Sequence, residues 1–257
     1  MNTNQTFNWK RFTAALRKEW AENRTMLLLI IAGIFLFYLL IFSLNIPAES
    51  KRMVNFFAIN YGIVILSCIV PSLAFRQLTS KNGRIQFFST PASTVEKYAV
   101  GVTIYVIGFA IVFAACVQLA DLVRFAFINR DSAPVVLADS IKMMIDNRDL
   151  NWNGIPYYSW VAAVATAPLF FMGSILWPRW AVVKTFALTY VVSFFLIIVF
   201  PIMQFFLQRS TDSSSTIYKA QFQYFIDGFN LIMMVVCLVL SWYLFKRKNI
   251  VSLKWWE

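Results

Sequence analysis

The sequence predicts an all-α polytopic membrane protein. Two features of the composition indicate this class: 60% of the 257 residues are hydrophobic, and the mean hydropathy is +0.65. A soluble domain rarely exceeds about half apolar residues. Six runs are also long enough to cross a bilayer, which needs roughly 20 apolar residues each. We therefore expect residues 1–257 to form a single transmembrane domain with six helical spans.

The six spans are predicted to alternate with short polar segments. They cover about 26–44, 54–75, 98–127, 158–177, 182–207 and 227–245. The third span is longer than the hydrocarbon core requires, so we expect it to tilt or to project from the membrane. Three prolines lie within or near the ends of spans, and they fit tolerated kinks and hinge points equally well: Pro71, Pro168 and Pro201.

Charge predicts how the spans are oriented. With the N-terminus inside, the inner side holds 15 of the 23 Lys and Arg residues and 4 of the 12 acids, which are Glu19, Glu22, Glu96 and Glu257. The inner side then carries the whole net charge of +11. This positive-inside signal places both termini in the cytoplasm, and we expect the chain to lie in the cytoplasmic (inner) membrane. The pI near 9.7 thus indicates topology and anionic lipid contact, and not nucleic-acid binding.

Residues 7–24 are predicted to form an amphipathic helix before the first span. Trp9, Phe12, Leu16 and Trp20 recur at spacings of three or four, which places them on one helix face. Basic residues lie mainly on the other side. This pattern is typical of an interfacial helix that lies among lipid headgroups with its aromatic face toward the lipid tails. The alternative is a simple lead-in to the first span with ordinary interfacial aromatics.

Residues 76–97 form the longest polar interruption on the inner side. The segment is basic, contains the adjacent Phe87 and Phe88, and continues to Pro91. Ser93 and Glu96 then fit a capping box, in which each side chain accepts a hydrogen bond from the backbone N–H of the other residue. We expect this segment to fix the third span rigidly behind a short exposed element, where force enters from a partner protein.

The other segments between spans are predicted to differ in character. Residues 45–53 should form a short outer turn, 128–157 an outer segment with a short surface helix, and 208–226 a mobile outer loop with a Ser/Thr-rich start. The inner turn over 177–180 is very short and contains two Trp residues, which suit a membrane interface.

Motifs for catalysis and for metal binding are not found in the sequence. It contains no His, no GxxxxGK[ST] phosphate loop, no HExxH and no CxxC. Residues 149–154 match the first half of an EF-hand loop, but its twelfth position is Trp160 instead of Glu, which disfavours calcium. Three well-separated cysteines are expected to be small buried hydrophobes: Cys68, Cys116 and Cys237. We therefore expect no enzyme activity, cofactor or metal on this chain itself.

Charged side chains within the spans lie near the span ends. Asp121 and Arg124 lie one helical turn apart toward the outer end of the third span. We expect an ion pair at the interface, with an outer gate or a substrate contact as the alternative. Carriers driven by protons or sodium usually have carboxylates near the midplane of the membrane. Here the span middles contain only uncharged polar groups such as Asn60, which argues against ion-driven transport.

Two stretches resemble the transmembrane subunit of ABC-2 type transporters. Such permeases often have an apolar pair, then Pro-Ala-Ser or a similar sequence, and then Glu-Lys before the third span, as in residues 87–97. Residues 173–185 are similar to the short turn between the fourth and fifth spans of bacterial members, although Pro178 departs from that pattern. The layout of six spans and an N-terminal amphipathic helix is also similar.

The resemblance implies an ABC-2, type V exporter-like fold and the function of a permease subunit. Its substrate would be hydrophobic, such as a lipid, a peptide or a drug. It further implies two copies of an ABC ATPase subunit, which would bind ATP and Mg, and a second permease copy or homologue. In this family a coupling helix in the first inner loop docks on the ATPase, which corresponds here to about 76–91. The residues assigned to this coupling region are Arg84, Phe87, Phe88, Pro91, Ser93 and Glu96. The alternative for Phe87 and Phe88 is that they anchor in the membrane surface.

Two other functions stay open at this point. One is a membrane module without transport activity on the same scaffold, such as a sensor, immunity or assembly subunit. The other is an ATP-independent channel or carrier, which the absence of midplane charge weakens. Association with an ATPase would favour the permease, whereas a stable monomer without one would exclude it.

Overall fold

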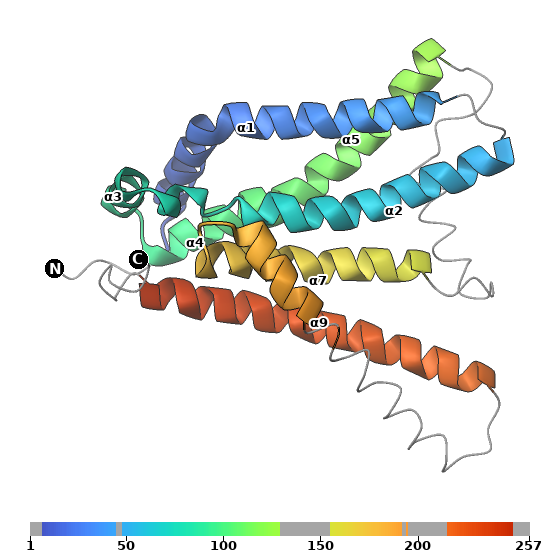
Figure 1. The fold of residues 1–257 in the computed structure, drawn as a ribbon. Helices are drawn as coiled ribbons and strands as arrows, with labels where there is room; N and C mark the ends of the chain where they lie inside the picture. Colours follow the sequence, from blue (N-terminus) through green and yellow to red (C-terminus); the bar gives the residue numbers. More distant parts are fainter. Residues whose placement is uncertain (1–6, 45–47, 129–154, 192–193, 195–214, 249–257) are drawn as a thin grey trace.

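The computed structural model describes residues 7–44, 48–128, 155–191, 194 and 215–248 (Figure 1). Within these ranges all regular structure is helical, so the predicted all-α class is confirmed. The helices lie side by side in an elongated bundle. Four of them are long and apolar enough to cross a membrane: Trp9–Ser43, Val54–Ser72, Thr94–Phe127 and Gly228–Arg247.

The first half of the chain contains two long helices, a short polar element and a third long helical run. Helices α1 (Trp9–Ser43) and α2 (Ala48–Ser72) are followed by the 3₁₀-helix η1 (Arg76–Thr79) and by α3 (Lys81–Ser89). The third run consists of α4 (Thr94–Val102), the π-helix η2 (Thr103–Gly108), α5 (Phe109–Val123) and the π-helix η3 (Arg124–Ile128).

Three further helices complete the described bundle. These are α7 (Ile155–Leu176), a helix over Ala181–Val191, and α9 (Ser215–Lys248). Their apolar parts within the described residues include Ala165–Leu176 and Ala181–Val191, which are shorter than a span and correspond to the fourth and fifth predicted spans. Most of 192–207 lies outside the described residues. Six spans and their inside–outside orientation therefore stay predictions.

Two segments predicted as outer loops are partly helical. The sequence predicts a loop over 208–226, whereas α9 begins at Ser215 and continues through the predicted sixth span. Tyr218, Phe222 and Phe225 recur at helical spacing, which outweighs the Ser/Thr-rich start. Helix α2 likewise begins at Ala48, inside the turn predicted over 45–53. The surface helix and the EF-hand-like residues predicted between 128 and 157 fall largely outside the described residues.

The predicted interfacial helix and the first span form one helix, α1. The Asn8 side chain accepts a hydrogen bond from the Lys10 backbone N–H at 3.0 Å and so caps the helix start. No Gly or Pro occurs before Gly33 in α1, so no residue in this stretch breaks the helix. Figure 1 shows that α1 is bent, and its first turns (dark blue) run in a different direction from the rest.

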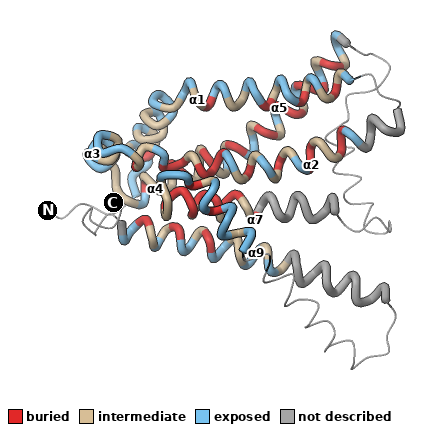
Figure 2. Tube along the Cα trace, viewed as in Figure 1, coloured by how far each residue is buried: buried red, intermediate tan, exposed pale blue. Residues whose placement is uncertain are grey.

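Helix α7 lies between α2 and α9, and α1 packs on α5. Rings fill the space between these helices: the centroids of Tyr38 and Phe113 are 5.6 Å apart, and those of Phe75 and Phe245 are 5.1 Å apart. Buried residues gather where α2, α4 and α7 meet (Figure 2). The core therefore extends to the end of the bundle at which α4 begins.

Hydroxyl groups join helices inside this apolar bundle. The Ser67 and Thr166 hydroxyls are 2.7 Å apart and link α2 to α7. The Tyr98 hydroxyl donates to the Leu238 carbonyl at 3.0 Å and lies 2.7 Å from the Ser241 hydroxyl, which links α4 to α9. Such contacts satisfy polar groups that have no water partner among apolar helices.

The contact between α1 and α2 predicts a rescue experiment. The Tyr38 hydroxyl donates to the Ala58 carbonyl at 3.1 Å, and a Cβ atom added at Gly62 would overlap that hydroxyl. Gly62→Ala should therefore lower the free energy of unfolding by about 1–3 kcal/mol, the usual cost of overpacking. Adding Tyr38→Phe removes the overlapping oxygen, so the double variant should recover much of the stability. Thermal unfolding in detergent measures both effects.

Gly33→Ala is the matched control, because a Cβ atom there meets nothing within 4 Å. It should leave stability unchanged or raise it by up to about 1 kcal/mol through helix propensity. Equal losses for Gly62→Ala and for the double variant would contradict the assigned contact.

Candidate functional site

The residues predicted to contact a partner lie at one end of the bundle. We call it the polar end: here α1 and α4 begin, α9 ends and α3 is located (Figure 1). The turn over 177–180 also lies here, because the Thr79 hydroxyl of η1 donates to the Pro178 carbonyl at 3.1 Å. The two predicted inner segments are therefore in contact with each other.

The predicted capping box is present at the start of α4. The Ser93 hydroxyl accepts from the Glu96 N–H at 3.2 Å, and the Glu96 carboxylate accepts from the Ser93 N–H at 2.7 Å. These bonds satisfy two backbone N–H groups at the start of α4 that have no carbonyl partner in the helix. Pro91 is exposed in the turn between α3 and α4. The predicted capping box is therefore confirmed.

Glu96 also reaches α1, a contact that the sequence analysis missed. Its Oε1 atom accepts from the Asn8 N–H at 2.8 Å and lies 3.3 Å from Arg11 Nη2. The Glu96 side chain is fully buried. We call Glu96, Ser93, Asn8 and Arg11 the carboxylate junction. One negative charge thus lies at the N-termini of both α1 and α4, where both helix dipoles favour it.

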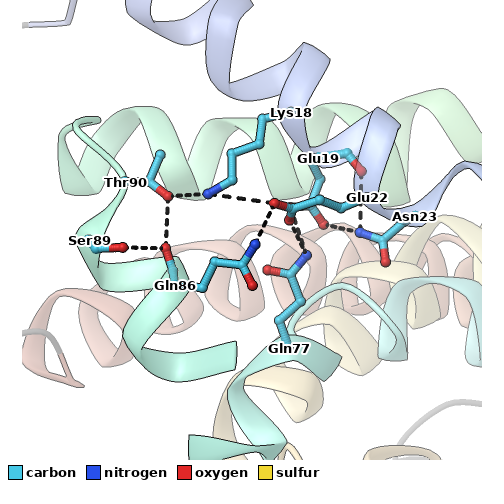
Figure 3. Close-up of polar contacts among 8 residues, drawn as sticks. All are labelled: Lys18, Glu19, Glu22, Asn23, Gln77, Gln86, Ser89 and Thr90. Atoms are coloured by element: carbon cyan, nitrogen blue, oxygen red, sulfur yellow. Dashed lines mark hydrogen bonds and ion pairs between the residues drawn. The ribbon is translucent and has the colours of Figure 1, made fainter. Parts of the chain in front are cut away.

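A second contact joins α1 to the segment that follows α2. Figure 3 shows this polar seam, which consists of Lys18, Glu19, Glu22 and Asn23 of α1 with Gln77, Gln86 and Thr90. Lys18 Nζ donates to the Thr90 hydroxyl at 2.6 Å and lies 3.6 Å from Glu22. Gln86 Nε2 donates to Glu22 at 2.9 Å. The seam therefore holds η1 and α3 against the first turns of α1.

Gln77 and Tyr105 extend these contacts to Glu19. Gln77 Nε2 donates to the Glu19 carboxylate at 3.3 Å, and the Tyr105 hydroxyl of η2 donates to it at the same distance. Asn23 Nδ2 donates to Glu19 at 2.8 Å. The carboxylate thus has donors from η1, η2 and its own helix, which compensates for its loss of water contacts.

The seam changes the interpretation of residues 7–24. Trp9 and Trp20 are 67% and 46% exposed, whereas Phe12 is buried and Leu16 is half-buried. The Phe12 ring packs 5.3 Å from the Trp9 ring between centroids. The four predicted anchors therefore do not share one exposed face, and several polar residues of this helix face the seam. An interfacial position for the two Trp residues stays a prediction.

Helix α3 presents the two predicted Phe residues differently. Phe87 turns inward, with its ring centroid 6.2 Å from that of Phe75 and 6.1 Å from that of Phe245. Phe88 is 43% exposed, Ile85 is 69% exposed and Arg84 is half-buried. Ile85 is not among the predicted contacts, because the prediction rested on the adjacent aromatic pair alone. The spacing of three residues between 85 and 88 is the signal that pairs them on one helix face.

Lys97 joins the end of α3 to α4. Its Nζ atom lies 5.3 Å from the Phe87 ring centroid and 5.9 Å from the Phe88 ring centroid. It also donates to the Phe88 carbonyl at 3.3 Å. A cation is stabilised both by the faces of aromatic rings and by the free carbonyls at a helix C-terminus. Helices α1, α3 and α4 are therefore held to one another by several independent contacts.

Asp121 and Arg124 form the predicted ion pair, but they are buried. Arg124 Nη2 lies 2.8 Å from Asp121 Oδ1, and Arg124 Nε donates to the same atom at 3.0 Å. The two residues are 0% and 2% exposed, respectively. Helix α1 packs against both α5 and η3, which carry the pair. The pair is thus enclosed by helix packing, and its predicted position at the membrane interface stays a prediction.

The described part of the chain has no group of three or more His, Cys, Asp or Glu side chains suited to a metal ion. The carboxylates of the polar end are instead engaged by backbone N–H, amide and cationic groups. This arrangement suits mechanical connection between helices.

Glu96→Gln tests the carboxylate junction. Gln keeps the side-chain shape but loses the charge, and its amide NH₂ would face one of the N–H donors that the carboxylate now accepts. We expect a loss of about 1–3 kcal/mol in the free energy of unfolding, the cost of leaving a buried donor unpaired. Glu22→Gln is the matched control, because the Glu22 side chain is 28% exposed. This substitution should lower the free energy of unfolding by less than about 1 kcal/mol. Equal effects in thermal unfolding would contradict the junction.

Asp121→Asn tests the buried ion pair. It removes the negative charge that neutralises Arg124, so we expect a loss of about 3–5 kcal/mol in the free energy of unfolding. Replacing both residues by apolar ones, with Asp121→Leu and Arg124→Met, should cost much less for the same reason. Thermal unfolding of the two variants separates these outcomes. A double variant at least as unstable as Asp121→Asn would show that the pair itself is needed for stability.

Comparison with known proteins does not assign a family or a function to the chain. No model of a protein family, no curated protein and no solved structure matches the chain. A function can therefore be proposed only from the residues and contacts described above.

Proposed function

We propose that this chain is the permease subunit of an ABC-2 type transporter. It would move a hydrophobic substrate across the cytoplasmic membrane, driven by ATP that a separate ATPase subunit hydrolyses. The observation that carries the proposal is α3, a short helix at the polar end with an exposed apolar pair, Ile85 and Phe88. Four apolar helices of spanning length support the membrane part of the proposal.

The surface of α3 suits a protein partner. Ile85 and Phe88 are exposed together with Lys81, and exposed apolar side chains are unfavourable unless a partner or the membrane surface covers them. The positive-inside pattern of the sequence favours a partner in the cytoplasm, because α3 lies in a segment that is predicted to be on the inner side. Protein interfaces commonly have apolar residues at their centre and polar residues at their rim.

The side of α3 that faces the bundle can transmit a movement to α1 and α4. Phe87 inserts among core rings, Lys97 binds the end of α3, and the polar seam holds α3 on α1. A displacement of α3 would therefore also act on α1 and α4. Since α4 continues into the span Thr94–Phe127, this movement would enter the membrane directly.

The proposed cycle uses these contacts in order. Closure of the ATPase dimer pushes α3, and the capping box at Ser93 and Glu96 passes the push to the start of α4. The carboxylate junction moves the start of α1 at the same time. The two permease copies, or a permease and its homologue, would then rock against each other and expel the substrate or extract it from the bilayer. ATP and Mg would bind the partner subunits.

Ile85→Ser combined with Phe88→Ser tests the docking surface. The tagged full-length chain is purified from membranes of its natural host, and retained proteins and ATP hydrolysis are measured. We expect the unmodified chain to retain a subunit with a GxxxxGK[ST] motif. The double variant should lose that subunit and most of the ATP hydrolysis, because it removes the exposed apolar anchors.

Asn82→Ala is the matched control, since Asn82 is exposed on the same helix but is not apolar. It should retain the ATPase. An unmodified chain that is stable and active without any ATPase would exclude the permease and favour a sensor, an assembly subunit or an ATP-independent carrier. Retention of the ATPase by the double variant would instead reject α3 as the docking site.

A further inference from the structure

An open groove of about 690 Å³ lies where α1 passes η1, beside the polar seam. Met26, Leu29 and Ile30 of α1 form its apolar wall. Glu22, Asn23 and Arg76 are among its polar lining residues. Polar residues precede apolar ones along α1, so the groove changes from polar to apolar along the helix. Leu29 is 68% exposed, which leaves the apolar wall open to a ligand.

Arg76 provides a cation at the polar part of the groove. The residue is exposed, and its Nη1 atom donates to Met26 Sδ at 3.7 Å, which is a weak acceptor. The ion pairs found among the described residues join Arg11 to Glu96, Lys18 to Glu22 and Arg124 to Asp121. None of these pairs includes Arg76, so its guanidinium can bind an anion from outside the described chain.

Glu22 does not neutralise Arg76, although it also lines the groove. Its carboxylate accepts from Gln86 at 2.9 Å and from Gln77 at 3.2 Å, and it pairs with Lys18 (Figure 3). These donors engage both carboxylate oxygens on the side of the seam. Both carboxylate oxygens of Glu22 thus have partners in the seam, and none of the ion pairs found among the described residues joins Glu22 to Arg76.

We propose that this groove binds an anionic phospholipid, with its phosphate at Arg76 and an acyl chain along Met26, Leu29 and Ile30. A planar guanidinium binds phosphate through two parallel hydrogen bonds. The change from polar to apolar residues on α1 matches the change from headgroup to acyl chain. The positive charge of this side of the chain favours a lipid with net negative charge, such as phosphatidylglycerol. Free phosphate would leave the apolar wall unused.

Binding of fluorescent phosphatidylglycerol to the isolated full-length chain in detergent micelles tests this site. Arg76→Gln should weaken binding about tenfold or more, as expected for loss of charge-assisted hydrogen bonds. Leu29→Gln, which alters only the apolar wall, should weaken it as well. Arg179→Gln is the matched control, because Arg179 is an exposed arginine of the polar end outside the groove. Phosphatidylcholine should bind more weakly than phosphatidylglycerol to the unmodified chain.

Three other results would each contradict the proposed lipid site. Equal losses for Arg76→Gln and Arg179→Gln would indicate general charge attraction. Competition by inorganic phosphate together with no effect of Leu29→Gln would indicate a free anion site. Unchanged lipid binding by the Arg76→Gln variant would show that Arg76 does not bind the phosphate. No ATPase takes part in this measurement, so the lipid site and the docking surface on α3 can fail independently.

Discussion

The structure depends on one buried carboxylate. Glu96 accepts the N–H groups of Asn8 and Ser93 and pairs with Arg11, so it closes the starts of α1 and α4 with a single charge. A buried charge is stable only with such partners. The N-cap residues of two helices that are far apart in the chain, Asn8 and Ser93, therefore both donate their N–H groups to Glu96. Separating α1 from α4 would break the bonds of Glu96 to Asn8 and Arg11, whereas its bond to Ser93 lies within α4 and would remain.

The polar seam follows from the same constraint. The first turns of α1 contain charged residues although the helix continues into an apolar span, and the half-buried carboxylate of Glu19 needs hydrogen-bond donors. Gln77 and Gln86 supply amide donors, and Thr90 binds Lys18. With this face of α1 occupied by the chain itself, the adjacent Arg76 is left beside the apolar wall of the groove. A docking surface on α3 and a lipid site beside η1 would then act on the same helix, α1.

Local patterns could be predicted from the sequence, and long-range contacts could not. The capping box requires only that Ser93 and Glu96 lie three residues apart, and hydropathy over about 20 residues identifies an apolar helix. Phe87 and Phe88 are adjacent and chemically identical, so their composition cannot show that one packs against Phe245 while the other is exposed. The start of α9 at Ser215 was missed because a Ser/Thr-rich run outweighed the apolar spacing that follows it.

The sequence by itself determined the helical class, the apolar spans that meet the length criterion, the capping box and the pairing of Asp121 with Arg124. These features depend on residues close together in the chain, where spacing defines geometry. Only the tertiary structure decided that Glu96 also caps α1, that Glu19 and Glu22 face η1 and α3, and that the ion pair is buried. Each of these depends on which helix packs against which, and pair spacing within one helix contains no information about its neighbour.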